Sequence, residues 1–280
     1  MRALLAAMAV VAGGVSAWGQ PASASARTML AAVVDQQGRP VVDLGLDDFV
    51  VSEGGAPRDV LDVHVADYPL ALILDDRAES RPTFDAIRNA AQRFTQRVGE
   101  RPVALVRLTD GGHLVAGLSD DRETVRTRIA TLTPGGDVNT PPLDTIAATA
   151  SLLKGSGAPF SAVVVIAGGP VDASALVRGE LLPQILDSGA AVHVVQLGAG
   201  GVVAGGVVDA DLLRVVADQS HGQFTTVYSG ASMPAALDRL ADRLAIELMV
   251  QYLVPPGPRE GDAKVGVRLP GARVVGLGVR

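Results

Sequence analysis

The sequence predicts an α/β fold in which helices cover both faces of a doubly wound, mostly parallel sheet, with a small all-β appendage. Two near-continuous hydrophobic runs, YPLALILD (68–75) and SAVVVIAGG (161–169), are typical of strands buried on both faces. Segments with helical spacing of apolar residues separate such runs along the chain. Strands that alternate with helices favour βαβ units and therefore a parallel sheet.

The appendage is predicted at the two ends of the chain. Residues 29–35, 48–55 and 60–66 have period-two character and are separated by Gly- and Pro-containing turns, which indicates short strands. The tail returns to the same character at 249–256, 263–270 and 272–280. Because chain ends often lie close together, we expect the tail to pair with the first strands.

The first half of the α/β segment follows a regular order. A helix is expected over 83–98, where apolar residues recur at helical spacing, and a hairpin over 102–118, around the turn Asp110–Gly112. Asp120 and Glu123 have capping-box spacing before the next helix. Thr140 is a good N-cap for another helix, with Pro141 at its first position.

The second half continues the alternation. After the strand at 161–169, a helix is expected from Ser174 to about Gly189, followed by a strand at 190–198. A helix over 209–222 is expected to end at Gly222. The predicted elements that remain are a strand at 223–229 and an amphipathic helix that begins near Ser232.

Composition bounds the class of protein. The 280 residues carry a net charge of −6 and no dense Lys/Arg stripe, which argues against a nucleic-acid partner. The apolar run at 3–15 is too short to span a bilayer but suits a secretory signal peptide, which we expect to occupy 1–26. The chain contains no cysteine. We therefore expect a periplasmic or secreted protein, with no membrane insertion after signal cleavage.

The residues at 33–63 and 244–254 suggest a family. "GRPVV" precedes "DDFVV" near the start, and "LAIELMVQYLV" runs from a helix into a strand. These motifs resemble those of the exported bacterial VWFA-related family, whose members contain a von Willebrand factor type A (VWFA) domain. The resemblance implies a Rossmann-like domain at 68–251, flanked by a β module at 27–67 that pairs with strands at 252–280.

The resemblance also implies a cation site. VWFA domains can hold a metal-ion-dependent adhesion site built from a D-x-S-x-S loop, a Thr in a second loop and an Asp in a third. Here Asp75 matches the first Asp, but Arg77 and Glu79 replace the two serines. By the same resemblance, further positions match the second and third loops: Thr140 as the loop Thr, Asp144 as the acidic residue after it, and Gly168 in place of the third-loop Asp.

The missing oxygen ligands predict a degenerate adhesion site. We expect Arg77 to act as the internal cation, by forking onto Asp75 or Asp144 in charge-assisted hydrogen bonds. Two alternatives remain open. Arg77 could point to solvent, or Asp75, Asp76 and Glu79 could still hold Mg²⁺ or Ca²⁺ through their oxygens.

The function predicted by analogy with the fold is non-catalytic binding of another protein, with no cofactor. The predicted partner face comprises the loops Asp75–Ser80, Gly135–Thr140 and Gly168–Asp172. Alternatives are a divalent-cation-dependent adhesion module that uses Asp75, Asp76, Glu79 and Thr140, a hydrolase of unknown substrate, and a structural subunit of an envelope assembly. The sequence contains no G-x-S-x-G elbow, and the Gly-rich segment 197–206 lacks dinucleotide-binding spacing.

Overall fold

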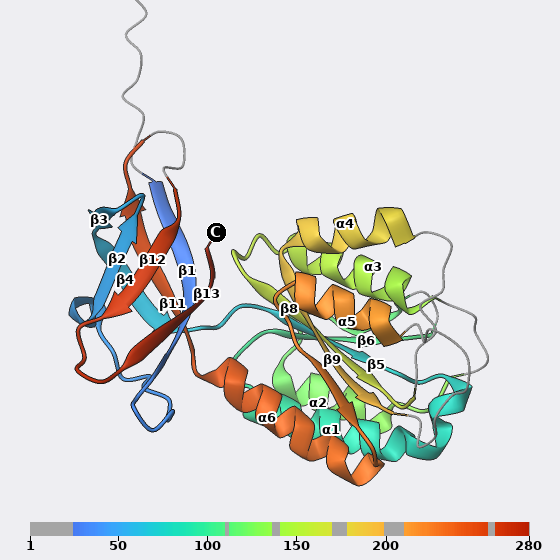
Figure 1. Cartoon of the computed structure of the whole chain (residues 1–280). Helices are drawn as coiled ribbons and strands as arrows, with labels where there is room; N and C mark the ends of the chain where they lie inside the picture. Colours follow the sequence, from blue (N-terminus) through green and yellow to red (C-terminus); the bar gives the residue numbers. More distant parts are fainter. Residues whose placement is uncertain are drawn as a thin grey trace, which may run out of the picture.

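The computed structural model describes residues 25–109, 112–135, 141–169, 178–198, 210–256 and 261–279. The predicted signal peptide, apart from its last two residues, lies outside these ranges. Figure 1 shows two parts, an α/β domain and a β module, joined where the chain leaves the module and where it returns. None of the described helices is long and apolar enough to cross a membrane.

The α/β domain is built on a mixed sheet. Its strand order is β10-β9-β8-β5-β6-β7, and every pair is parallel except the antiparallel hairpin β6–β7 at one edge. The α/β prediction is confirmed. The strands are β5 (Leu70–Leu74), β6 (Val103–Arg107), β7 (Leu114–Ala116), β8 (Ser161–Ala167), β9 (Ala190–Leu197) and β10 (Phe224–Val227).

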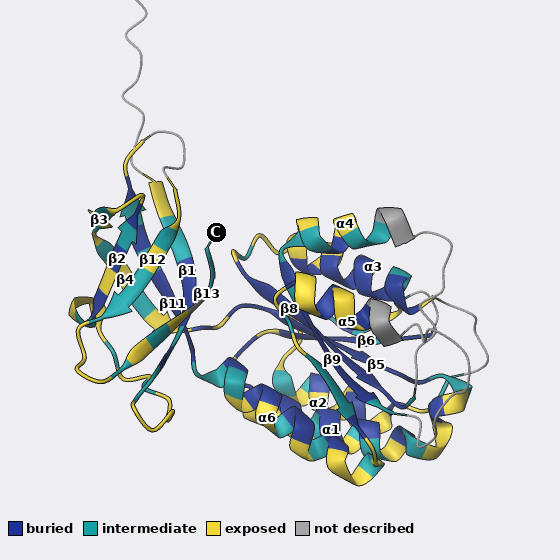
Figure 2. Cartoon of the chain, in the orientation of Figure 1, coloured by how far each residue is buried: buried dark blue, intermediate teal, exposed yellow. Residues whose placement is uncertain are grey.

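Helices cover both faces of this sheet (Figure 1). On one face lie α1 (Phe84–Arg97), α2 (Arg122–Thr131) and α6 (Met233–Ala245), and on the other lie α3 (Pro142–Lys154), α4 (Arg178–Ser188) and α5 (Ala210–Gln219). Successive residues of β5 supply the two cores: Leu70, Leu72 and Leu74 face α1 and α6, whereas Ala71 and Ile73 face α3. Burial on both faces explains the unbroken hydrophobic run in the sequence, and Figure 2 shows β5 and β8 buried along their length.

The β module consists of two small sheets around a separate core of alternating apolar residues. One sheet has the order β13-β1-β11-β4 and the other β12-β2-β3, so strands from both ends of the chain lie side by side. The module strands are β1 (Ser25–Val34), β2 (Phe49–Glu53), β3 (Ala56–Arg58), β4 (Val60–Val65), β11 (Glu247–Val254), β12 (Ala263–Val267) and β13 (Arg273–Val279).

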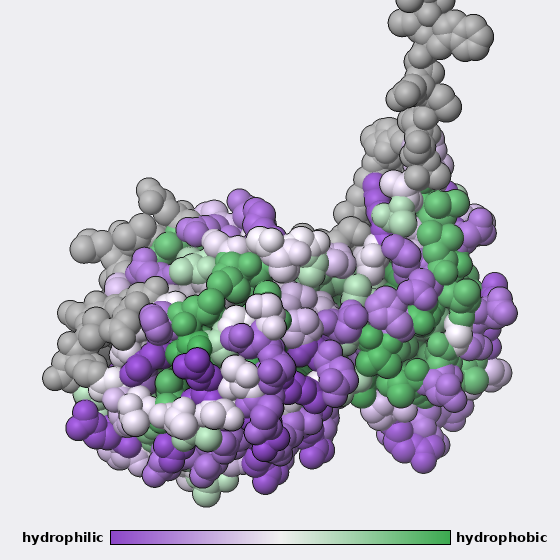
Figure 3. All heavy atoms as spheres, turned by 180° about the vertical axis from the view of Figure 1, so that it is seen from behind, coloured by the Kyte–Doolittle hydropathy of each residue, from purple (hydrophilic) through white to green (hydrophobic). Residues whose placement is uncertain are grey.

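The return to the module occurs earlier than the sequence predicts. Strand β11 begins at Glu247 and pairs with β1 from Ala32↔Glu247 onward, so Glu247–Gln251 belong to the module and not to the 68–251 segment. Leu248 and Val250 face the module core, so β11 is part of the module from its first residues onward. Most of the large exposed apolar side chains also lie on this module, where Figure 3 shows apolar surface.

Three predicted helix boundaries differ in detail. The N-cap of α2 is Asp121, whose carboxylate accepts from the Thr124 N–H, and not Asp120. Helix α3 begins at Pro142 with Pro141 as its N-cap, because a proline is compatible with extended backbone before a helix. After α5 it is His221 that adopts a left-handed conformation (φ 63°), whereas Gly222 allows close approach to the β9 backbone at Val192.

Candidate functional site

The two carboxylates after β5 lie at the carboxyl edge of the main sheet. Strand β5 is central, with β6 on one side and β8 on the other, and ligands of open α/β sheets bind at such a position. Asp75 and Asp76 are both fully buried. Their side chains turn to opposite sides, so that Asp75 contacts the residues after β8, whereas Asp76 contacts the end of β6.

Asp75 is bound by a fork from Arg77. The Arg77 guanidinium donates from Nε to Oδ1 (2.8 Å) and from Nη2 to Oδ2 (2.9 Å). Oδ2 also accepts from the Ser80 hydroxyl (2.5 Å) and the Gly168 N–H (3.0 Å). Of the two orientations considered for Arg77, the structure therefore has the one that forks onto Asp75. The carboxylate is saturated with donors from its own chain.

Gly168 is required by the packing around this carboxylate. A Cβ at this position would lie 2.6 Å from Thr83 Oγ1 and 2.7 Å from both Cβ and Oγ of Ser80. Ser80 and Thr83 belong to η2 (Ala78–Thr83), a short 3₁₀ helix before α1. This turn fills the space that a longer side chain after β8 would need.

Asp76 is bound by a second arginine. Arg107, at the end of β6, donates from Nε to Oδ2 (2.5 Å), and Thr109 donates from its N–H to Oδ1 (3.0 Å) and from its hydroxyl to Oδ2 (2.7 Å). Gly135 covers this cluster, since its N–H donates to the Asp76 carbonyl and a Cβ there would lie 2.8 Å from Asp76 Oδ2. Each buried carboxylate thus has its own arginine and its own close-packed glycine.

The electrostatics of the site follow from these contacts. The hydrogen bonds to Asp75 raise the pKa of Arg77 above its ordinary value, so the guanidinium stays charged. In the described part of the site, both oxygens of Asp75 accept hydrogen bonds from Arg77. A cation at Oδ1 of Asp75 would have to displace the Nε–H of Arg77, and a cation at Oδ2 would meet the Arg77 Nη2, Ser80 and Gly168 donors.

The other predicted site residues make fewer contacts with the Asp75 and Asp76 carboxylates. Glu79 lies exposed in η2, and Asp144 is half-buried in the first turn of α3. Thr140 lies outside the described residues, as do 136–139 and 170–172 of the predicted partner loops. The structure therefore brings together Asp75, Asp76, Arg77 and Gly168.

Four contributing residues were not predicted individually: Arg107 and Thr109 lie outside the predicted partner loops, whereas Ser80 and Gly135 were named only as ends of those loops. Arg107 and Thr109 had a signal in the sequence, because polar residues directly follow the apolar run of the neighbouring strand and must reach the same edge. For Gly135 the sequence indicated only the start of a loop, since its contact with Asp76 depends on the fold.

Comparison with solved structures agrees with this architecture. A von Willebrand factor type A protein from Catenulispora acidiphila matches with a TM-score of 0.52 and 10% identity, over 91% of this chain and 73% of that chain. Two crystal forms of proximal thread matrix protein 1 from the mussel byssus match with TM-scores of 0.53 and 0.52 and identities of 15% and 16%. The matches to the mussel protein cover 65% of this chain and 48% of that chain, or about half its length.

These similarities show the fold and nothing finer, because the identities are low. No protein-family model matches the sequence, and no curated protein matches it. The chain has a VWFA-like α/β fold.

Proposed function

We propose that this chain is an exported, non-catalytic module that binds another protein through the carboxyl edge of its main sheet and does so without a divalent cation. The VWFA-like fold supports the general class, by analogy, as an adhesion or protein-interaction module. The proposal that binding needs no divalent cation rests on one observation, the pair of hydrogen bonds that Arg77 donates to Asp75.

The size of the electrostatic repulsion supports an arginine in place of a metal ion. Two unit charges ~4 Å apart interact by about 4 kcal/mol at an effective dielectric of ~20, so a divalent cation beside a guanidinium is repelled about twice as strongly. Arg77 already supplies the positive charge that the buried Asp75 needs. The close packing of Gly168 against Ser80 and Thr83 also leaves no room for a third-loop carboxylate.

The proposal of a non-catalytic site rests on burial and occupancy. The side chain of Ser80 is fully buried, and its hydroxyl donates a hydrogen bond to the Asp75 carboxylate. Asp76 is likewise engaged by Arg107 and Thr109. Neither carboxylate has the free oxygen, exposed to substrate, that a general base needs.

Exposed side chains at the same edge would make the contacts with the partner. Glu79 and Arg81 are exposed in η2, and Tyr228 is 82% exposed directly after β10. Tyrosine and arginine are enriched among residues that dominate binding energy. The proposed interface therefore extends from η2 toward the end of β10.

A cation titration tests the first half of the proposal. We expect the melting temperature of the wild-type protein to be unchanged by millimolar Mg²⁺, Ca²⁺ or EDTA. In Arg77→Ser, which removes the internal cation and adds a hydroxyl oxygen, we expect Mg²⁺ or Ca²⁺ to raise the melting temperature. A clear stabilisation of the wild-type protein by either cation would refute the cation-independent proposal.

A capture experiment tests the second half. The protein is immobilised and exposed to a periplasmic extract, and the proteins retained are compared among variants. We expect the same retained partner to be lost with Glu79→Ala, Arg81→Ala or Tyr228→Ala. The control is Lys154→Ala, an exposed residue at the other end of the sheet, which should retain it. Equal capture by all four variants would place the interface elsewhere.

A further inference from the structure

A cavity of about 230 Å³ lies between the β module and the amino end of the main sheet, opposite the edge described above. Its α/β wall contains residues at the starts of β8 and β9 and at the end of α6, and its module wall contains residues of β1 and β13. The cavity is larger than the ~150 Å³ that accommodates benzene and smaller than the ~300–1,000 Å³ of drug-sized sites. Its size therefore suits a small organic molecule.

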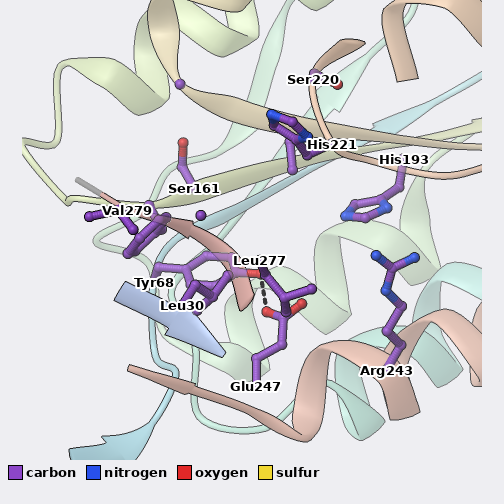
Figure 4. A pocket seen from close by; sticks show the side chains of 14 residues that line it. Leu30, Tyr68, Ser161, His193, Ser220, His221, Arg243, Glu247, Leu277 and Val279 are labelled. Carbon is purple, nitrogen blue, oxygen red and sulfur yellow. Dashed lines mark hydrogen bonds between the residues drawn. The ribbon is translucent and has the colours of Figure 1, made fainter. Parts of the chain in front are cut away.

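One side of the cavity is apolar. Figure 4 shows Leu30, Leu277 and Val279 together, near the ring of Tyr68. Leu30 and Leu277 belong to different strands of the module, whereas Tyr68 lies in the connection to β5. This side would contact the hydrocarbon body of a ligand.

The opposite side carries His193, a buried imidazole. The side chain projects from β9 into the cavity (Figure 4) and is 3% exposed, and its Nδ1 has no hydrogen-bond partner among the described residues. Burial lowers the pKa of His193 to about 3, so the ring is neutral and has one N–H to donate. Buried polar groups are almost always hydrogen-bonded, so the unpartnered Nδ1 of a ring that faces a cavity is available to a ligand.

The charge balance of the cavity indicates the sign of that molecule. Glu247 is already compensated, since the Tyr68 hydroxyl donates to its Oε2 at 2.5 Å and the Arg101 guanidinium lies 3.9 Å from that oxygen. Arg243 also lines the cavity, where it donates to the neutral amide oxygen of Gln223 (3.2 Å) and acts electrostatically on Glu247 together with Arg101. Two guanidiniums, Arg101 and Arg243, therefore act on the single carboxylate of Glu247, which leaves one positive charge in excess.

We propose that this cavity is a binding site for a small organic monocarboxylate. The carboxylate lies between the Arg243 guanidinium and the His193 imidazole, which both donate to it. The hydrocarbon body fills the space beside Leu30, Leu277 and Val279. A guanidinium–carboxylate pair with a second donor is a strong, charge-assisted arrangement, and a neutral ligand would forfeit it.

Titration with matched probes tests the proposal. Benzoate supplies both a carboxylate and a ring, benzamide keeps the ring without the charge, and inorganic phosphate has charge without a hydrocarbon body. We expect benzoate to bind the purified protein, by calorimetry and by a rise in melting temperature, with benzamide and phosphate at least about tenfold weaker, because a hydrogen bond between charged groups is lost or the apolar contacts are missing.

Two variants of α6 locate the site. Arg243→Gln should weaken benzoate binding at least about tenfold, whereas Arg239→Gln, which changes an exposed arginine one turn earlier in the same helix, should leave binding unchanged. Melting curves without ligand verify that both variants are folded.

Three results would overturn the proposal. The first is the absence of benzoate binding at millimolar concentration. The second is benzamide or phosphate binding as tightly as benzoate, which would remove the argument from either the charge or the apolar wall. The third is equal benzoate binding by Arg243→Gln and Arg239→Gln, which would place any bound benzoate outside this cavity.

Discussion

The guanidinium of Arg77 forms two parallel hydrogen bonds with the fully buried carboxylate of Asp75, from Nε to Oδ1 and from Nη2 to Oδ2. The two residues are separated by one residue in the sequence, so a single tight turn supplies both the buried anion and its counter-ion. The arginine side chain is itself only 16% exposed. This geometry makes the pair the structural centre of the carboxyl edge.

Removal of Arg77 should be strongly destabilising. In Arg77→Ser the Asp75 carboxylate keeps the Ser80 and Gly168 donors but loses its cation, and an uncompensated buried charge costs on the order of 3 kcal/mol. Urea unfolding followed by circular dichroism would measure the loss. Arg81→Ser, an exposed arginine in the same turn, is the matched control and should change the unfolding free energy little. Equal effects of the two substitutions would contradict the role assigned to the pair.

Two adjacent glycines should respond differently to the same substitution. At Gly168 an added Cβ meets Ser80 and Thr83 at 2.6–2.7 Å, whereas at Gly169 it meets no atom of the described residues within 4 Å, apart from the chain neighbours. We expect Gly168→Ala to lower the free energy of unfolding by about 1–3 kcal/mol through overpacking. Gly169→Ala should be close to neutral as far as the described residues determine it. Chemical denaturation of both variants checks the pair, and a neutral Gly168→Ala would show that η2 can shift away.

The junction between the two parts depends on Tyr68 and Glu247. The tyrosine lies in the connection into β5 and the glutamate at the start of β11, and the hydroxyl donates to Oε2 at 2.5 Å. Tyr68→Phe leaves a buried carboxylate oxygen without this donor, which should cost about 1–3 kcal/mol in urea unfolding. Tyr228→Phe, at an 82% exposed position, is the control and should have no measurable effect. A similar loss in both variants would argue against the junction contact.

Acidification should destabilise the protein through His193. Its pKa falls from 6.5 to about 3 on folding because burial disfavours the charged ring. Below about pH 6.5 the unfolded chain therefore takes up a proton that the folded chain refuses until about pH 3, so stability falls as the pH is lowered through this window. The slope from this one group approaches about 1.4 kcal/mol per pH unit.

The comparison of variants isolates this contribution. Between pH 6 and pH 4, the unfolding free energy of His193→Phe should fall less steeply than that of the wild type. The difference in slope should correspond to about one proton taken up on unfolding. Burial raises the pKa of Glu247, which acts in the opposite direction but is present in both proteins. His221→Asn is the control, because His221 is exposed and asparagine tolerates its left-handed backbone. An unchanged slope in His193→Phe would refute the assignment.

Much of the fold could be predicted from local patterns. The continuous apolar runs of β5 and β8 predicted doubly buried strands, and the spacing of Phe84, Ile87, Ala91 and Phe94 predicted α1. These predictions succeed because periodicity directly reflects which faces are buried. The strand at 249–256 was predicted to within two residues of the start of β11, but its register on β1 was not, since that partner strand is more than 200 residues earlier in the chain.

The sequence by itself determined that two carboxylates follow a central strand and that arginine and glutamate occupy two positions where the resembled site has serines. Those are properties of the order of residues. Only the tertiary structure decided that Arg77 turns inward onto Asp75, that Arg107 and Thr109 bind Asp76, and that Gly168 closes over Ser80. The physical reason is that side-chain orientation depends on space and hydrogen-bond partners supplied by distant strands, which no local pattern contains.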